Sequence, residues 1–355
     1  MRIARAAIGA AVAPRLENVS VLLLLCGVAL GPHGLAILTP SALSLLDPAA
    51  PVGLAVFGIV AAMRVRGPRR STPVAAALQA AVTGLVVAGA FFVARPAVPF
   101  PDHLPPWELA VVALGIAAAT SSALAWDGGE TSDVARPFTA DDALLPIVAG
   151  GLLLALQREA SVDAALELAA QVVGVAALVA ACGWLMVVRA STTEERLVGT
   201  FACVLLLGGA ADYLSMSALL CGVVAGAGWR LAGAATREHL RRDVTYAADS
   251  LLALVLVLAG AHADYSPVAL TLAIAYTVLR AAGKLAGAWI ARRLFPASTP
   301  PTARLLLAPG AFGVAFALNV VRALGDEFAV VLTVVVVGTI ASSAVAAVAD
   351  GGEEP

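Results

Sequence analysis

Charged residues are scarce in this chain, and their scarcity excludes a soluble globular protein. Only 13% of the 355 residues are Asp, Glu, Lys or Arg, while 61% are hydrophobic and the mean hydropathy is +0.93. A soluble domain has about a quarter charged residues and about half apolar ones. No water-soluble core could hold this much apolar surface, so the surplus must face lipid. The composition therefore predicts a membrane protein.

Cysteine, histidine and basic runs are sparse as well, which argues against several classes of function. The four cysteines lie inside apolar segments without a CxxC pair, and the four histidines fall in or beside predicted loops. Neither set has the spacing of a metal site or of a disulfide framework. No basic run favours nucleic acid binding, and the net charge is only −2. No nucleophile–base set is visible, so we expect neither an enzyme nor a cofactor.

What the sequence does contain is a series of apolar segments of spanning or near-spanning length. We predict twelve transmembrane helices, at about residues 20–38, 52–65, 72–94, 106–126, 138–156, 163–188, 196–212, 214–230, 246–261, 267–290, 303–322 and 327–348. No linker between them is long enough for a soluble domain. We therefore expect a short N-terminal segment at 1–19, a transmembrane domain at 20–349 and a tail at 350–355. The apolar stretch within 1–15 is too weak and short for us to expect a cleaved signal peptide.

The distribution of arginine tests this count and sets the orientation. If both termini are cytoplasmic, 17 arginines fall in the inside loops and 3 in the outside loops. Cytoplasmic loops carry the excess of positive charge in membrane proteins, and one missed helix would scramble the split. Arg outnumbers Lys 21 to 1, which is typical of a GC-rich bacterial genome. We therefore expect a multi-pass protein of a bacterial inner membrane with both termini in the cytoplasm.

A short internal echo suggests that the chain is built from two inverted halves. The hexapeptide Cys26–Gly31 of the first predicted helix is echoed by Cys221–Gly226 of the eighth, 195 residues later. Seven helices separate the two starts, and an odd spacing turns the second copy upside down. Inverted repeats are typical of secondary transporters, whose sites lie where the repeats meet. We expect repeats at about 20–160 and 214–349 in an all-α membrane protein.

One helix in each predicted repeat has residues that favour a break. The fourth helix carries a run of hydroxyl residues, and the eleventh carries Pro and Gly, which remove an amide donor and tolerate unusual dihedrals. The candidate break residues are Thr120, Ser121, Ser122, Pro309, Gly310 and Gly313. The second break begins 189 residues after the first, close to the repeat offset. The alternative interpretation is that the hydroxyls bond back to their own helix and that the Pro only kinks the eleventh.

Two adjacent carboxylates are the leading candidates for chemistry. Asp141 and Asp142 open the apolar run Ala143–Leu156. A carboxylate inside the bilayer costs at least a few kcal/mol and commonly carries function. Such an Asp can hold either a proton or a small cation on the same oxygens. The alternative is that the pair caps free amides at the start of the helix, after Pro137 and Thr139.

Two cations lie inside the tenth predicted helix. Lys284 is the only lysine of the chain and follows Arg280 by four residues, so both occupy one helix face. A buried cation needs a partner, and Asp141 or Asp142 is the leading candidate. The alternative is that Lys284 reaches towards the cytoplasmic interface.

Seven segments, in order, resemble motifs of the monovalent cation:proton antiporter superfamily. They are LLLCGVALGPHGLAIL, GLAVFGIVAAMRV, ATSSALA, ADDALLPIVAGGLLLAL, DYLSMSALLCGVVAGA, YTVLRAAGKLAGAWIARRLF and LLAPGAFGVAFALNVV. Together they cover about residues 20–348. The resemblance implies two crossed, discontinuous helices beside the ion-binding acids. It also implies a secondary antiporter that exchanges Na⁺ or K⁺ for protons.

The resemblance also assigns roles to residues. It implies Asp142 as the principal cation- and proton-binding carboxylate, and Asp141 as its neighbour, paired with Lys284 or Arg280. The break residues would lie at the two crossovers. The implied partners are a monovalent cation, protons and lipid, with the homodimer common among similar proteins and no nucleic acid.

Some features depart from the family pattern and keep two alternatives open. Thr120 and Asp142 are only 22 residues apart, which is shorter than the family spacing, and the family's first helix is reduced to Met1–Pro14. One alternative is a membrane scaffold or sensor that keeps the fold without transport. The other is an anion or organic-acid transporter on the same architecture.

Overall fold

The computed structural model describes residues 19–64, 71–95, 107–120, 135–158, 162–296, 306–307 and 310–350. Within these ranges every regular element is a helix, so the all-α prediction is confirmed for the described part of the chain. In chain order the helices are Val19–Leu30, α2 (Pro40–Leu46), α3 (Ala49–Arg64), α4 (Ser71–Ala94), α5 (Trp107–Ala119), α6 (Ala135–Arg158), α7 (Val162–Arg189), α8 (Thr193–Tyr213), α9 (Ala218–Arg230), α10 (Ala234–Ala261), α11 (Pro267–Leu294), α13 (Ala311–Leu324), the 3₁₀ helix Asp326–Phe328 and α14 (Ala329–Asp350). Each of the twelve predicted segments overlaps one of these helices. The predicted N-terminal segment lies almost wholly outside the described residues.

Five of these helices are long and apolar enough to cross a membrane. Two bent pairs raise that number to seven: α2 with α3, bent by 49°, and the two parts of α10, bent by 43°. The remaining apolar helices have 10 to 17 residues, as in Trp107–Ala119 and Ala311–Leu324. The architecture is therefore that of a multi-pass membrane protein that combines full-length and shorter helices.

Local signals at the helix starts match the sequence. Thr192 and Glu195 form a reciprocal capping box at the start of α8, so amides that lack intrahelical partners are bonded there. Ser266 caps α11, and Pro267 occupies the first turn, where its missing amide costs nothing. Ser217 caps α9 by accepting a hydrogen bond from the Leu220 amide.

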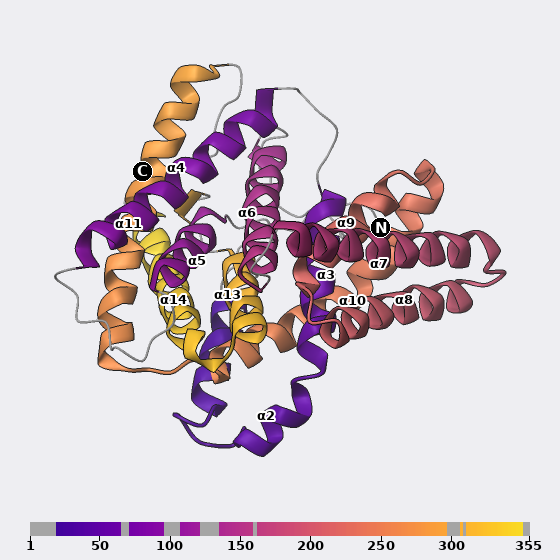
Figure 1. Ribbon diagram of the computed structural model, residues 1–355, viewed down its shortest axis with the longest axis horizontal. Helices are drawn as coiled ribbons and strands as arrows, with labels where there is room; N and C mark the ends of the chain where they lie inside the picture. Colours follow the sequence, from indigo (N-terminus) through magenta and orange to yellow (C-terminus); the bar gives the residue numbers. More distant parts are fainter. Residues whose placement is uncertain are drawn as a thin grey trace.

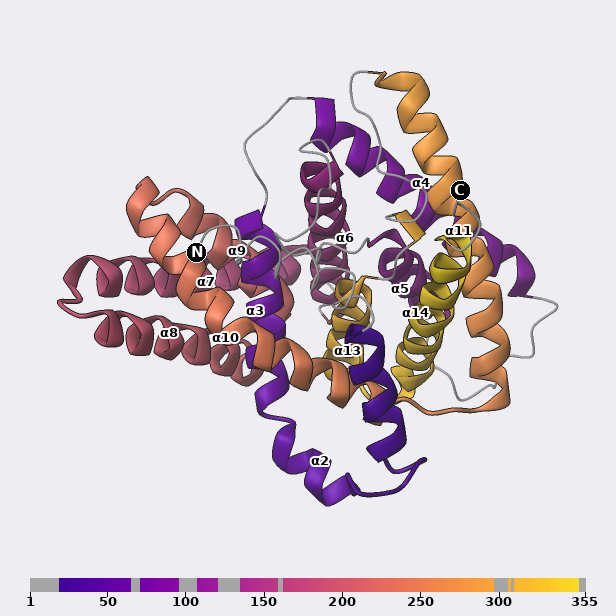
Figure 2. The same ribbon diagram turned by 180° about the vertical axis from the view of Figure 1, so that it is seen from behind.

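The helices fall into two groups that lie side by side (Figure 1). The crossed-helix group consists of α4, α5, α6, α11, α13 and α14, which contact one another extensively. The flanking group consists of Val19–Leu30, α2, α3, α7, α8, α9 and α10. The helices α7 and α8 project from it as an antiparallel pair (Figures 1 and 2). The view from behind shows the same division (Figure 2).

Glycine allows the closest helix contacts within the flanking group. A Cβ at Gly27 would fall on the Val257 carbonyl of α10. A Cβ at Gly222 would likewise fall on the Ala55 carbonyl of α3. Membrane helices use such small residues to bring backbones together, because lipid supplies no hydrophobic force between helices. These glycines therefore fix the distances within the flanking group.

A buried ion pair adds a specific link inside the same group. The Nε and Nη2 atoms of Arg196 in α8 donate to the two carboxylate oxygens of Asp243 in α10, at 2.7 and 3.3 Å. A bidentate guanidinium–carboxylate pair fixes orientation as well as distance. The pair therefore sets the position of α10 against α8 at one end of the group.

Candidate functional site

The first half of the site is the end of α5. This helix stops at Ala119, next to the predicted break at Thr120. The Thr120 hydroxyl donates to the Ala117 carbonyl at 2.7 Å, so it bonds back to its own helix as the alternative interpretation expected. The helix nevertheless ends there, deep in the protein, since Thr120 is 1% exposed. Its last carbonyls therefore need donors from other elements.

The second half of the site is the start of α13. Gly310 has extended dihedrals and precedes the first helical residue, Ala311. On the other side of the interruption, residues 306 and 307 are helical. The eleventh predicted segment is thus interrupted before Ala311, while Pro309 itself lies outside the described residues.

The two interruptions meet. A Cβ on Gly313 would lie 2.9 Å from the Thr120 hydroxyl oxygen and 3.0 Å from the Ala117 carbonyl oxygen. Contacts this close require glycine, because a larger residue would push α13 away from the end of α5. Thr120, Gly310 and Gly313 are all buried. Ser121 and Ser122 lie outside the described residues.

Two buried cations of α11 reach this meeting point. The Lys284 ammonium donates to the Ala119 carbonyl at 2.6 Å, and Lys284 is fully buried. The Arg280 guanidinium donates to the Thr120 carbonyl at 3.3 Å and to the Leu307 carbonyl at 2.9 Å. Arg280 therefore links the ends of both interrupted helices. Because the carboxyl end of a helix carries a partial negative charge, the two cations compensate both ends at once.

Lys284 does not reach towards the cytoplasmic interface, which was the alternative interpretation. Its ammonium group is held by a backbone carbonyl inside the protein. The backbone of Asp141 and Asp142 belongs to α6, which packs against α4, α5 and α13. Their side chains lie outside the described residues, so their pairing with Lys284 or Arg280 stays a prediction.

The sequence interpretation missed two buried polar residues of α4. Gln79 and Thr83 are both fully buried, and Gly283 and Gly287 of α11 pack against their backbones. The side-chain amide nitrogen of Gln79 donates to the Thr83 hydroxyl at 3.4 Å. The side-chain oxygen Oε1 of Gln79 has no hydrogen-bond partner among the described residues. Gln79 is the one amide in the apolar segment 72–94, and this was the signal that could have found it.

Comparison with known proteins is informative at the level of structure. No protein family model matches the chain, and neither does any curated protein sequence. The solved structure of the sodium/proton antiporter MjNhaP1 from Methanocaldococcus jannaschii at pH 8 matches with a TM-score of 0.67, over 98% of this chain and 94% of that chain, at 16% identity. The chain has the fold of a sodium/proton antiporter. The predicted resemblance is thereby confirmed for the fold.

Proposed function

We propose that this protein is a secondary antiporter that exchanges a monovalent cation, Na⁺ or K⁺, for protons. One observation carries the proposal. Within the fold of an antiporter, two interrupted helices meet in the protein interior, and two buried cations neutralise their ends. Keeping unwound backbone and two cations at that depth is costly, and membrane proteins accept such a cost where a polar substrate passes.

The chemistry is proposed to reside on Asp142. One carboxylate can hold a proton or a cation, but not both, so binding of one releases the other. Coupled to a movement that exposes the site to one side at a time, this competition gives exchange without any other energy source. Asp141 would be the neighbour that pairs with Lys284 or Arg280. The moving part would be the crossed-helix group, which contains α5, α6 and α13.

The architecture is proposed to be two inverted repeats with twelve spans. The contacts of Gly27 and Gly222 support the repeat, because these glycines are 195 residues apart and their partners, Ala55 and Val257, are 202 apart. A second set of contacts has the same offsets. Gly58 lies against Leu219, and Gly260 lies against Leu24. A two-fold exchange of α3 with α10 and of Val19–Leu30 with α9 relates all four contacts.

The count of twelve has its own support. Five single helices, two bent pairs and five shorter apolar helices together match the twelve predicted segments. We assign the protein to a bacterial inner membrane on the excess of Arg over Lys, with both termini in the cytoplasm on the arginine distribution.

Transport by reconstituted vesicles tests the function. Wild-type protein should dissipate an imposed pH gradient when Na⁺, K⁺ or Li⁺ is added. Asp142→Asn should abolish this flux, because an amide neither titrates nor binds a cation with a full charge. Asp163→Asn is the matched control, since Asp163 is an exposed carboxylate at the start of α7, and it should transport normally. Failure of the wild-type protein to respond to any of the three cations would contradict the proposal.

A further inference from the structure

Two polar side chains interrupt the otherwise apolar helix α13. Asn319 and Arg322 lie one turn apart near its carboxyl end, and every other residue of the helix is apolar. The Asn319 amide nitrogen donates to the Ser217 hydroxyl at 3.1 Å, and Asn319 is buried. Ser217 is the cap of α9, which belongs to the flanking group. A side chain of the crossed-helix group is therefore bonded to the flanking group.

Arg322 also links α13 to the flanking group, through ion pairs. Its Nη2 lies 2.9 Å from the Asp212 carboxylate in the last turn of α8, and its Nη1 lies 3.7 Å from Asp47 at the end of α2. The same Asp47 oxygen lies 3.4 Å from Nε2 of His262, the residue that ends α10. Arg322 of α13 thus contacts two elements of the flanking group directly, and Asp47 links it to a third.

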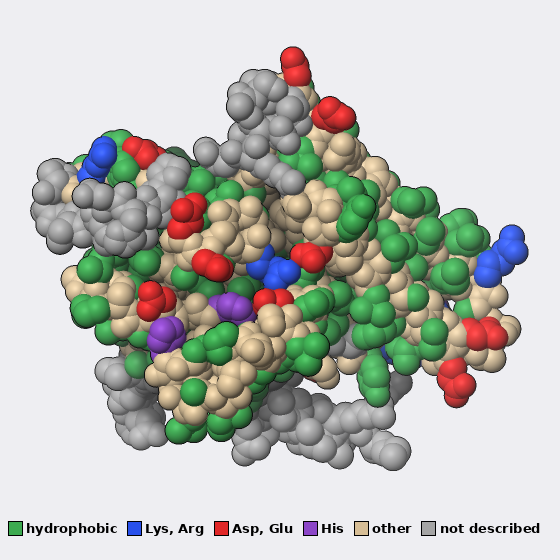
Figure 3. Space-filling view, turned by 60° about the horizontal axis from the view of Figure 1, so that its bottom comes forward, with side chains coloured by type: hydrophobic (Ala, Val, Ile, Leu, Met, Phe, Trp, Pro, Cys, Tyr) green, Lys and Arg blue, Asp and Glu red, His purple; other side chains and the backbone are tan. Residues whose placement is uncertain are grey.

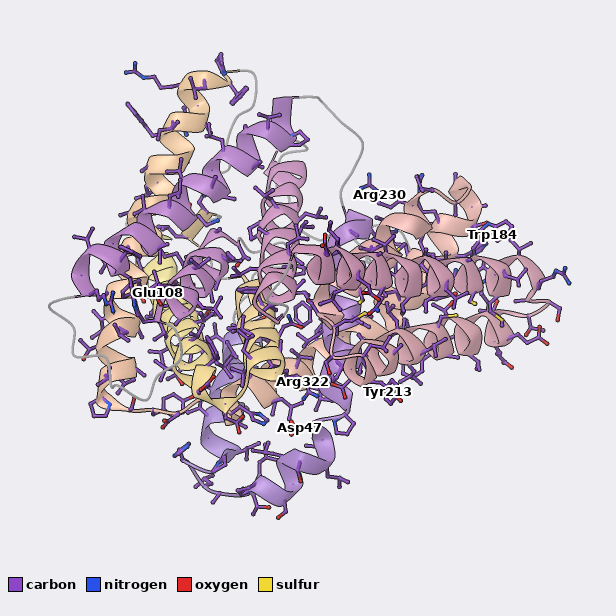
Figure 4. The ribbon with its side chains drawn as sticks, in the orientation of Figure 1. Asp47, Glu108, Trp184, Tyr213, Arg230 and Arg322 are labelled. Atoms are coloured by element: carbon purple, nitrogen blue, oxygen red, sulfur yellow. The ribbon has the colours of Figure 1, made fainter. Side chains whose placement is uncertain are left out.

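This cluster lies at one end of the molecule. Figure 4 places Arg322, Asp47 and Tyr213 close together at that end. Seen from the same end, basic side chains lie in a hollow with acidic and histidine side chains around them (Figure 3). The cluster is therefore open to water on one side.

A small cavity lies beneath the cluster, on the boundary between the two groups. It has a volume of about 20 Å³ and is lined by Gly151 and Leu154 of α6, Val172 of α7, Ser217, Leu220 of α9 and Ala323 of α13. A space of this size holds about one water molecule. The boundary is thus not fully packed at this point, and Ser217 makes the lining partly polar.

We propose that Asn319 and Arg322 form a latch with Ser217, Asp212 and Asp47 that holds the boundary closed at this end. Movement of the crossed-helix group against the flanking group breaks these contacts and opens the cavity to water. The proposal rests on the proposed function only in treating this movement as part of transport. The latch itself requires only two conformations of the protein, one with these contacts made and one with them broken.

The strength of the contacts suits a latch that opens repeatedly. The side chains of Arg322, Asp47 and Asp212 are 24%, 37% and 49% exposed, so water screens their ion pairs and each contributes little. The buried Arg196–Asp243 pair is the contrast, because it lies within the flanking group and is costly to break. Weak pairs thus lie across the boundary, and the strong pair lies where no movement is needed.

Cysteine accessibility tests the latch without measuring transport. The full chain would carry Val172→Cys, with Cys26, Cys182, Cys203 and Cys221 replaced by Ala, because Val172 is buried in the cavity wall. A membrane-impermeant thiol reagent should react slowly with this protein in vesicles. Adding Arg322→Gln should raise the rate about tenfold or more, because loss of the latch increases the open population. Arg189→Gln, at an exposed arginine of α7, is the matched control and should leave the rate unchanged.

A charge exchange separates a latch from a merely structural arginine. Arg322→Asp combined with Asp212→Arg should return the labelling rate towards the slow value, whereas each reversal alone should not. If Arg322→Gln does not fold, Asp47→Asn with Asp212→Asn serves the same purpose. An unchanged labelling rate in the folded variant overturns the latch. Absence of cation-dependent proton flux in the wild type would sink the antiport proposal while leaving this labelling result in place.

Discussion

Gly313 has no room for a side chain, because α13 passes directly over the end of α5 at this residue. The Thr120 hydroxyl and the Ala117 carbonyl are the atoms that a Cβ would meet. The glycine is therefore needed for close approach, and its dihedral freedom is not the reason. This contact decides how far apart the two interrupted helices lie.

Gly313→Ala should reduce both stability and transport. Overpacking of a dense site costs about 1–3 kcal/mol, and here the strain falls on the meeting point of the breaks. We expect a lower thermal midpoint in detergent and a flux in vesicles that is lower by about tenfold, the factor that 1.4 kcal/mol of barrier gives. Adding Thr120→Ala should restore part of both, since it removes the nearest atom. Gly174→Ala faces open space and is the control. Equal behaviour of Gly313→Ala and Gly174→Ala would contradict the argument.

For Lys284, the sequence predicted the burial of the side chain but not its hydrogen-bond partner. Its uniqueness and its place in an apolar helix predicted a buried role shared with Arg280, and the structure places both side chains in the interior. Their carbonyl partners at Ala119, Thr120 and Leu307 were not predictable. Those carbonyls are free to accept hydrogen bonds because two helices stop there. A sequence pattern can indicate that a helix stops, but it does not show which carbonyls then meet which donor.

At the scale of helices, the glycine contacts make a symmetric prediction. Gly27→Ala and Gly222→Ala should each lower the thermal midpoint, because each Cβ would fall on a backbone carbonyl that has no space to move. If the repeat is real, the two losses should be similar in size. Gly209→Ala, which meets nothing within 4 Å, should have little effect. Thermal unfolding in one detergent measures all three variants, and a loss at only one of the two glycines would argue against equivalent repeats.

Helix positions could be read from hydropathy, but helix ends often could not. The fourth predicted segment runs to residue 126, whereas α5 stops at Ala119. Lys284 donates to the Ala119 carbonyl there, and Arg280 donates to the carbonyl of Thr120. The ninth was predicted from 246, whereas α10 begins at Ala234. Its first turns are polar and include an exposed Glu238–Arg241 pair, so they continue the helix beyond the apolar stretch. The short helix α2 was missed, because its seven residues carry no periodic signal.

At the scale of the whole molecule, the ion pairs join connections that the predicted topology puts on the same side. Arg322, Asp47, Asp212 and His262 belong to four different connections that the arginine count puts outside, and the structure brings them together at one end. Arg196 borders one connection predicted to be inside and Asp243 lies in another, and they too are paired. Sequence alone could group these connections by side, but it could not show which residues meet.

Two single cysteines should decide the orientation. In a chain without native cysteines, Gly233→Cys lies in the exposed connection before α10 and Asp264→Cys lies in the exposed connection before α11. The excess of arginine in the inside connections holds those loops in the cytoplasm during insertion. An impermeant thiol reagent should therefore label Asp264→Cys in intact cells and leave Gly233→Cys unlabelled, while both should react in broken membranes. The reverse labelling pattern would mean that the predicted orientation is wrong and that the Arg322 latch lies on the cytoplasmic side.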